Sequence, residues 1–118
     1  MSRKRLYVAG AYSANNVTDL MGNMRRGIQL SARALKEGFA VYSPWCDCLL
    51  HFHERFTLEE CYGYSMPWLE ASDAVLVVQR NSEQSKGTQA ELARACELGI
   101  PIFNTLLELV EWRNAANG

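Results

Sequence analysis

Blocks of apolar and polar positions along the chain predict a repeated order of strands and helices. Residues 74–78, AVLVV, form a continuous apolar run rich in β-branched side chains, as in a strand buried on both faces of a parallel sheet. A polar loop follows, and Gly87 and Thr88 then open a helix that ends at Gly99. Residues 100–103 are the next apolar run. This segment therefore predicts a strand, a loop, a helix and a second strand.

The rest of the chain continues this order. Further strands are expected at residues 6–9 and 39–42, and further helices at about 18–36, 65–71 and 105–115. Pro67 would lie in the first turn of its helix, where proline is tolerated. Residues 45–62 have no clear period and predict a long loop over the site, with at most one short helix. The order predicts a flavodoxin/Rossmann-like three-layer α/β sandwich, with a small parallel sheet and the first strand central.

Length and charge narrow the class of protein. With 118 residues the chain is expected to form one domain, residues 1–118. Its net charge of -1 and its lack of a basic stripe do not support binding to duplex nucleic acid. The apolar run near the N-terminus is too short for a signal peptide or a membrane span, so we expect a cytoplasmic protein without membrane contact. The four cysteines are then expected to be thiols: Cys46, Cys48, Cys61 and Cys96.

The expected topology brings candidate residues from two distant segments to one edge of the sheet. Ligands of open α/β sheets bind outside the carboxyl ends of the strands. The turn at Gly10, Ala11 and Tyr12 and the first turn of the later helix, with Glu91, both lie there. Gly10 would let a ligand approach the backbone closely, and Tyr12 offers a phenol. An acidic residue in a first helical turn is also an ordinary capping feature, so Glu91 alone does not prove a site.

The start of that later helix is expected to attract anions. Its free amides would form a positive terminus: those of Gly87, Thr88 and Gln89. The same terminus is expected to keep Glu91 ionised. The stretch SKGT is not a Walker A loop, because it lacks the GxxxxGK[ST] pattern.

These segments resemble the nucleoside 2-deoxyribosyltransferase superfamily, particularly its short, phage-type members. The match covers roughly residues 6–103: a first strand ending in GAY, a second ending in YSP, then WLEASDAVLVV and SKGTQAELARACELGIPI. The last segment is the most specific. In that family the glutamate of a motif similar to GTxxEL attacks the anomeric carbon of a nucleoside or nucleotide.

The resemblance implies roles for individual residues. Glu91 would be the catalytic nucleophile, and Tyr12 would be its hydrogen-bonding partner. The turn at Gly10 and Ala11 would border the substrate. Ligands for the sugar or a phosphate would be Ser85, Gly87 and Thr88. The implied activity is that of an N-glycosidase or deoxyribosyltransferase acting on a nucleoside or nucleoside 5'-monophosphate.

One position departs from the family's pattern. Family members commonly have an aspartate eight residues before the position of Asp73, where this chain has Ser65. Asp73 begins the strand at the opposite end of the sheet from the site, so it cannot easily substitute. A serine at the site edge donates a hydrogen bond but is a poor acid. A general acid would have to come from the irregular loop, whose candidates are Asp47, His51, His53 and Glu54.

The irregular loop carries a second constellation, CDCLLHFHE. Four of its side chains are of zinc-binding types: Cys46, Cys48, His51 and His53. They fall within eight residues, whereas structural zinc sites usually divide their ligands between two separated pairs. The other interpretation is a mobile lid in which His51 and His53 contact base or phosphate. Trp45 and Phe52 would then stack on a base or belong to the core.

Three functions follow in order of preference. The first is the glycosyl-transferring or glycosyl-hydrolysing enzyme, with a small nucleoside or nucleotide as partner and no cofactor or metal. The second is a non-catalytic nucleotide-binding protein of the same fold, because of Ser65. The third is a small zinc-binding protein that uses the loop from Cys46 to His53. The last helix has more apolar residues than one face needs, and family members often complete the site with a neighbouring subunit, so a homodimer or larger homo-oligomer is expected.

Overall fold

The computed structural model describes residues 2–117 and contains a parallel sheet between two layers of helices. The strands are β1 (Arg5–Ala9), β2 (Ala40–Tyr42), β3 (Ala74–Val77) and β4 (Ile102–Phe103). The α-helices are α1 (Val17–Lys36), α2 (Leu58–Glu70), α3 (Lys86–Glu97) and α4 (Leu106–Asn117). Two 3₁₀ helices, η1 (Pro44–Phe52) and η2 (Ser82–Gln84), lie between them. The predicted α/β sandwich is confirmed.

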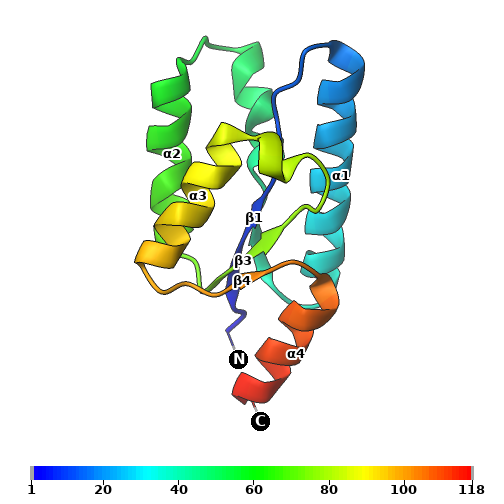
Figure 1. Cartoon of the computed structure of the whole chain (residues 1–118), viewed down its shortest axis with the longest axis vertical. Helices are drawn as coiled ribbons and strands as arrows, with labels where there is room; N and C mark the ends of the chain where they lie inside the picture. The colour runs from blue at the N-terminus through cyan, green and yellow to red at the C-terminus, as the bar shows by residue number, and fades with distance from the viewer. Residues whose placement is uncertain (1, 118) are drawn as a thin grey trace.

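The strand order is β2-β1-β3-β4, and all three pairings are parallel. The first strand is therefore central, as predicted, and the order matches the start of a flavodoxin-like sheet. Figure 1 shows α2 and α3 on one side of the sheet and α1 on the other. Since the order of strands reverses at β1, the loops after β1 and β3 border the crevice where ligands of such folds bind.

The central strand shows why both faces of the sheet are apolar. Leu6 and Val8 belong to the core cluster beneath α1 and α4, whereas Tyr7 and Ala9 belong to the cluster beneath α2 and α3. All four are at most 1% exposed. Successive side chains of a strand point to opposite faces, so a strand covered on both sides must be apolar at every position. A tyrosine at such a position needs a hydrogen-bond partner for its hydroxyl.

Helix α2 begins at Leu58, earlier than the predicted residue 65. Its cap is Thr57, whose hydroxyl accepts a hydrogen bond from the Glu60 amide at 3.1 Å. The Glu60 carboxylate accepts one in return from the Thr57 amide at 2.9 Å, which completes a capping box. Pro67 therefore lies in the helix interior and not in the first turn, so that prediction was wrong. The longer helix carries Ser65 near its middle.

The segment before α2 is the 3₁₀ helix η1, longer than the predicted short helix. It is attached to the core by Trp45, which is 1% exposed and donates from its indole nitrogen to the Ala11 carbonyl at 3.1 Å. The indole packs on Gly27 of α1, where an added Cβ would lie 2.3 Å from the ring. Trp45 is therefore a core residue, and it also lines the cavity described below.

The apolar residues of α4 mostly face the sheet. Leu109 is buried, and Leu106, Val110 and Trp112 pack against the same cluster. Leu107 is 68% exposed. The excess apolar surface that suggested a subunit interface on this helix is therefore largely used inside the molecule. None of the helices in the described part of the chain is both long and apolar enough to cross a membrane.

Candidate functional site

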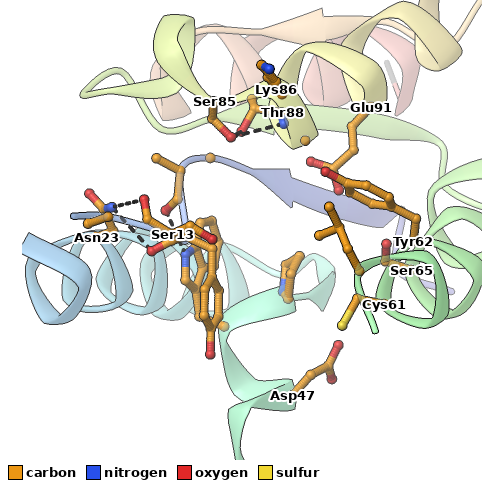
Figure 2. A pocket seen from close by; sticks show the side chains of 18 of the residues that line it. Ser13, Asn23, Asp47, Cys61, Tyr62, Ser65, Ser85, Lys86, Thr88 and Glu91 are labelled. Atoms are coloured by element: carbon orange, nitrogen blue, oxygen red, sulfur yellow. Dashed lines mark hydrogen bonds between the residues drawn. The ribbon is translucent and has the colours of Figure 1, made fainter. Parts of the chain in front are cut away.

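A cavity of about 1080 Å³ opens at the carboxyl ends of β1 and β3. Its walls come from the turn after β1, the start of α1, η1, α2, the loop after β3 and the first turns of α3. Figure 2 shows Glu91 directed into this space from α3, opposite side chains of α2 and η1. The volume matches pockets that enclose a small organic ligand. Distant parts of the sequence therefore meet at one site, as predicted.

Glu91 is the most deeply placed carboxylate of the cavity. It is 9% exposed, and one of its carboxylate oxygens accepts a hydrogen bond from the Tyr7 hydroxyl. Burial raises the pKa of Glu91 to about 7, although the hydrogen bond from Tyr7 lowers this pKa. Burial therefore opposes the ionised form that the helix terminus was expected to favour.

The hydrogen-bonding partner of Glu91 is thus Tyr7, in the middle of β1. Tyr12 lines the same cavity, but the group that reaches the Glu91 carboxylate is the Tyr7 hydroxyl. Burial and the neighbouring Glu91 raise the pKa of Tyr7, so the phenol stays a proton donor. Sequence reasoning missed Tyr7 because it lies within an apolar strand. The available signal was a tyrosine in a doubly buried strand, since its hydroxyl requires a partner.

The start of α3 is capped by its own residues. The Ser85 hydroxyl accepts a hydrogen bond from the Thr88 amide at 3.2 Å, and the Ser85 carbonyl accepts one from the Gln89 amide at 3.0 Å. Of the three amides expected to be free for an anion, those of Thr88 and Gln89 are therefore occupied. Ser85, Gly87 and Thr88 all line the cavity, as predicted, together with Lys86. Lys86 adds a positive charge at this end of the site (Figure 2).

Asn23 of α1 holds the turn after β1 through hydrogen bonds. Its amide nitrogen donates to the carbonyl oxygens of Tyr12 and Ser13 at 3.3 and 3.4 Å. Its oxygen accepts from Arg26 at 2.7 Å and from Asn81 at 3.3 Å. Asn23 is 5% exposed. This one amide therefore connects the loops that follow β1 and β3, the two loops of the crevice.

Gly10 and Ala11 line the cavity as predicted, but the close approach at Gly10 is to the protein. A Cβ at Gly10 would lie 2.8 Å from Cβ of Val78 and 3.0 Å from the Trp45 ring. Any side chain there would displace Val78, directly after β3, or the indole. Gly10 is therefore required by packing at the turn as well as by its place on the cavity wall.

Ser65 lies on the α2 wall of the cavity, and Asp73 lies at the other end of the sheet. Asp73 accepts a hydrogen bond from the Arg5 amide at 2.7 Å, far from the site. The expected separation of these two residues is confirmed. The Ser65 hydroxyl lies close enough to the Tyr7 hydroxyl to oppose the rise in the pKa of Tyr7. Ser65 is thus a neutral neighbour of the Tyr7 and Glu91 pair.

The η1 segment places its candidate residues differently from the prediction. His51 lines the cavity and His53 is exposed outside it, so the proposed contact from His53 is not observed. Asp47 also lines the cavity. Among residues 2–117, no group of three or more His, Cys, Asp and Glu side chains is placed to hold a metal ion. The four side chains of the alternative zinc interpretation therefore do not converge on a common metal position.

Removing the Tyr7 hydroxyl should raise the pKa of Glu91 further. The hydrogen bond favours the ionised carboxylate, so Tyr7→Phe is expected to move this pKa upward from about 7. A pH titration of ¹³C-labelled glutamate side chains by NMR measures the change. Tyr12→Phe is the matched control, because it removes a phenol from the same cavity and should leave the pKa unchanged. An effect of Tyr12→Phe alone would assign the partner to Tyr12.

The fold and the site define a flavodoxin/Rossmann-like α/β protein with a ligand cavity at the carboxyl edge of its sheet. The chain belongs to the family described as a domain of unknown function (DUF4406), whose model matches residues 4–104. No curated protein is similar enough to give a match. The family description carries no activity, and it does not name the nucleoside 2-deoxyribosyltransferases.

Proposed function

We propose that this protein cleaves the N-glycosidic bond of a nucleoside or nucleoside 5'-monophosphate, with Glu91 as the nucleophile. The observation that carries the proposal is a nearly buried carboxylate, held by the Tyr7 hydroxyl, on the wall of a cavity large enough for a nucleoside or nucleotide. A glutamate that served only as a helix cap would instead be directed to solvent and to its own helix terminus. The resemblance of the GTQAEL segment to the glycosyl-transferring motif supports the same assignment.

The chemistry requires Glu91 in its ionised form. A carboxylate oxygen attacks the anomeric carbon while the bond to the base nitrogen breaks, and the base leaves with the electron pair and takes up a proton. Water then adds to the glycosyl ester and releases the sugar, or a second base replaces water and accepts the glycosyl group. Tyr7 holds the carboxylate in one orientation throughout. Ser65 can donate a hydrogen bond near the reaction centre but not supply an acidic proton.

The positively charged end of the cavity, at the start of α3, is relevant to whether the substrate is a nucleoside or a nucleoside 5'-monophosphate. Lys86 and Gly87 at the start of α3 are the groups best suited to a 5'-phosphate, because they combine a cation with a helix terminus. Ser85 adds a hydroxyl, although it already serves as the cap of α3. A monophosphate bound there would place its sugar beside Glu91, one turn further along the helix.

The direct test is base release from a panel of substrates. Ribonucleosides, deoxyribonucleosides and their 5'-monophosphates are incubated with the protein, with and without a second free base, and followed by chromatography. We expect release or exchange of the base from at least one of them. Intact-mass spectrometry after rapid acid quenching should then show the protein with one glycosyl group added. Absence of turnover with every substrate would overturn the enzymatic proposal.

A second candidate is a nucleotide-binding protein that does not catalyse. It is favoured by Ser65, which places a neutral hydroxyl next to the Tyr7 and Glu91 pair. It predicts a rise in melting temperature with a nucleoside or nucleotide and no free base in the same samples. The substrate panel therefore separates the two functions.

A further inference from the structure

A second tyrosine and carboxylate pair places one member, the carboxylate of Asp47, on the cavity wall, and sequence reasoning did not identify this pair. Tyr42, at the end of β2, donates a hydrogen bond from its hydroxyl to the carboxylate of Asp47 at 2.5 Å. Asp47 lies in η1 and lines the cavity. Tyr42 is held on its other side by Trp68, with stacked rings and a centroid distance of 5.7 Å. The Asp47 side chain is therefore positioned from the sheet, although it belongs to a 3₁₀ segment.

The two pairs are neighbours across the sheet. Tyr7 and Tyr42 are register partners on β1 and β2, and their rings stack with centroids 5.3 Å apart and planes 18° from parallel. One ring hydroxyl holds Glu91 and the other holds Asp47. Figure 2 shows Asp47 on the far side of the cavity from Glu91, with Ser65 and Cys61 on the wall between them. A ligand whose sugar lies at Glu91 has room to extend its base toward Asp47.

The Asp47 carboxylate is positioned to accept a hydrogen bond from a ligand in the cavity. Burial, and then its hydrogen bond to Asp47, raise the pKa of Tyr42, so this phenol stays protonated and donates. That bond uses one carboxylate oxygen and leaves the other for a donor on the ligand. An ionised carboxylate has acceptors only and repels a carbonyl oxygen placed against it.

The remaining charge of the cavity is consistent with such a ligand. The charged residues that line it are four carboxylates and one lysine: Asp19, Asp47, Glu60, Glu91 and Lys86. A cavity of this sign favours a ligand of low negative charge that presents hydrogen-bond donors. The single lysine can balance one phosphate group but not a chain of them.

We infer that Asp47, positioned by Tyr42, is a specificity-determining residue that selects nucleobases bearing an exocyclic amino group. Cytosine and adenine present an NH₂ donor where uracil and hypoxanthine present a carbonyl oxygen. This inference rests on the proposed function, because it takes the sugar to lie at Glu91. It goes beyond that function by assigning the class of base.

The test compares nucleosides that differ only at this group. Binding of deoxycytidine and deoxyuridine, and of deoxyadenosine and deoxyinosine, is measured by isothermal titration calorimetry. The wild-type protein is expected to bind the amino member of each pair about tenfold to a hundredfold more tightly, because the other member leaves the carboxylate unpaired against a carbonyl. Base release measured on the same pairs should show the preference mainly in KM.

Asp47→Asn removes the charge and offers an NH₂ donor of its own, with little change in shape. It is expected to abolish the preference or to turn it toward the carbonyl-bearing bases. Tyr42→Phe leaves the carboxylate but removes its hydroxyl support, so it should weaken the preference without reversing it. Glu59→Gln is the matched control, because it removes one charge from an exposed position on α2 outside the cavity. This control should keep the full preference.

The outcomes separate the two proposals. Nucleosides that bind without an amino preference, or a preference that survives Asp47→Asn, would overturn the role of Asp47 and leave the glycosidic function standing. No binding of any nucleoside or nucleoside 5'-monophosphate to the wild-type protein would overturn both. If Asp47→Asn has a lowered melting temperature, Tyr42→Phe serves as the test in its place. A preference for the amino-bearing base that is unchanged in Tyr42→Phe counts against the inference.

Discussion

Glu91→Gln is expected to lose about 10⁴-fold or more in turnover of the best substrate, the usual scale for removing a catalytic nucleophile. Glutamine keeps the size of the side chain but cannot form the glycosyl ester. Because Glu91 is 9% exposed and sits against Tyr7, the variant still fills its place in the wall. KM should change much less than kcat. The rates are measured by base release at saturating substrate.

Glu97→Gln is the control for this substitution, because it alters a glutamate at the exposed end of the same helix. It should retain wild-type turnover. A Glu91→Gln protein that keeps more than about a tenth of the turnover would contradict a covalent role for Glu91, since the loss would then be of hydrogen-bond size only. Loss of the glycosyl adduct in the mass spectrum should accompany the loss of turnover.

The pH dependence of the wild-type reaction follows from the same residue. The reactive form of Glu91 is the carboxylate, and its pKa is raised by burial to about 7. Turnover should therefore increase as pH rises through about 7, with about a tenth of the nucleophile ionised one pH unit below the pKa. A turnover that is flat between pH 5 and pH 9 would show that this ionisation does not control the rate.

The stability of the fold should move in the opposite direction with pH. The pKa of Glu91 is about 7 in the folded protein, against an ordinary value of 4.5 for a glutamate, so the folded state binds this proton more tightly than the unfolded chain does. The contribution is full below pH 4.5 and is lost as pH rises to 7, by about 3 kcal/mol. Glu91→Gln should therefore unfold at higher denaturant concentration than the wild type at pH 8. Chemical denaturation of both proteins at pH 5 and pH 8 measures this difference.

Gly27→Ala adds one methyl group to α1. This substitution is expected to lower the free energy of unfolding more than a methyl group added anywhere else on the helix. The new Cβ would lie 2.3 Å from ring atoms of Trp45, which is fully buried and cannot move freely. A displaced indole would also lose its hydrogen bond to the Ala11 carbonyl and disturb the turn at Gly10. We expect a loss of about 3 kcal/mol in the free energy of unfolding, or roughly 10 °C in melting temperature.

Gly22→Ala on the same helix is the matched control. Its Cβ would meet only the guanidinium end of the Arg26 side chain, at 3.3 Å. Alanine is the better helix former by about 1 kcal/mol, so this variant should be unchanged or slightly more stable. Equal effects of the two substitutions in thermal unfolding would show that the contact between Gly27 and Trp45 does not limit α1.

The pattern of apolar residues was sufficient to predict the layers of the fold. Continuous apolar runs identified β1 and β3 as strands covered on both faces, and helical periodicity together with terminal glycines identified α1 and α3. These signals are local. Burial of a segment on one face or on both faces determines which neighbouring positions are apolar, so the pattern can be read from a short stretch of sequence. The start of α2 was missed although its capping box can be read in TLEE, since the irregular stretch before it obscured the signal.

The candidate site was only partly readable from the sequence. The motif around Glu91, with the family resemblance, was enough to name the carboxylate and the loop beside it as candidates. Three features depended on the tertiary structure: the partner of Glu91, the direction of its pKa shift, and the position of His53 outside the cavity. Each is set by which distant side chains share one low-dielectric space, and no local pattern encodes that arrangement.

The sequence by itself thus determined the parallel α/β order and brought Glu91 to the carboxyl edge of the sheet. Only the tertiary structure decided that Tyr7 and Tyr42, neighbours across β1 and β2, each hold a carboxylate of one cavity. The physical reason is the register of β1 and β2, which sets which residues of the two strands lie opposite each other. The pairing of two strands places side chains 35 residues apart in ring-to-ring contact, and that pairing is a property of the assembled sheet.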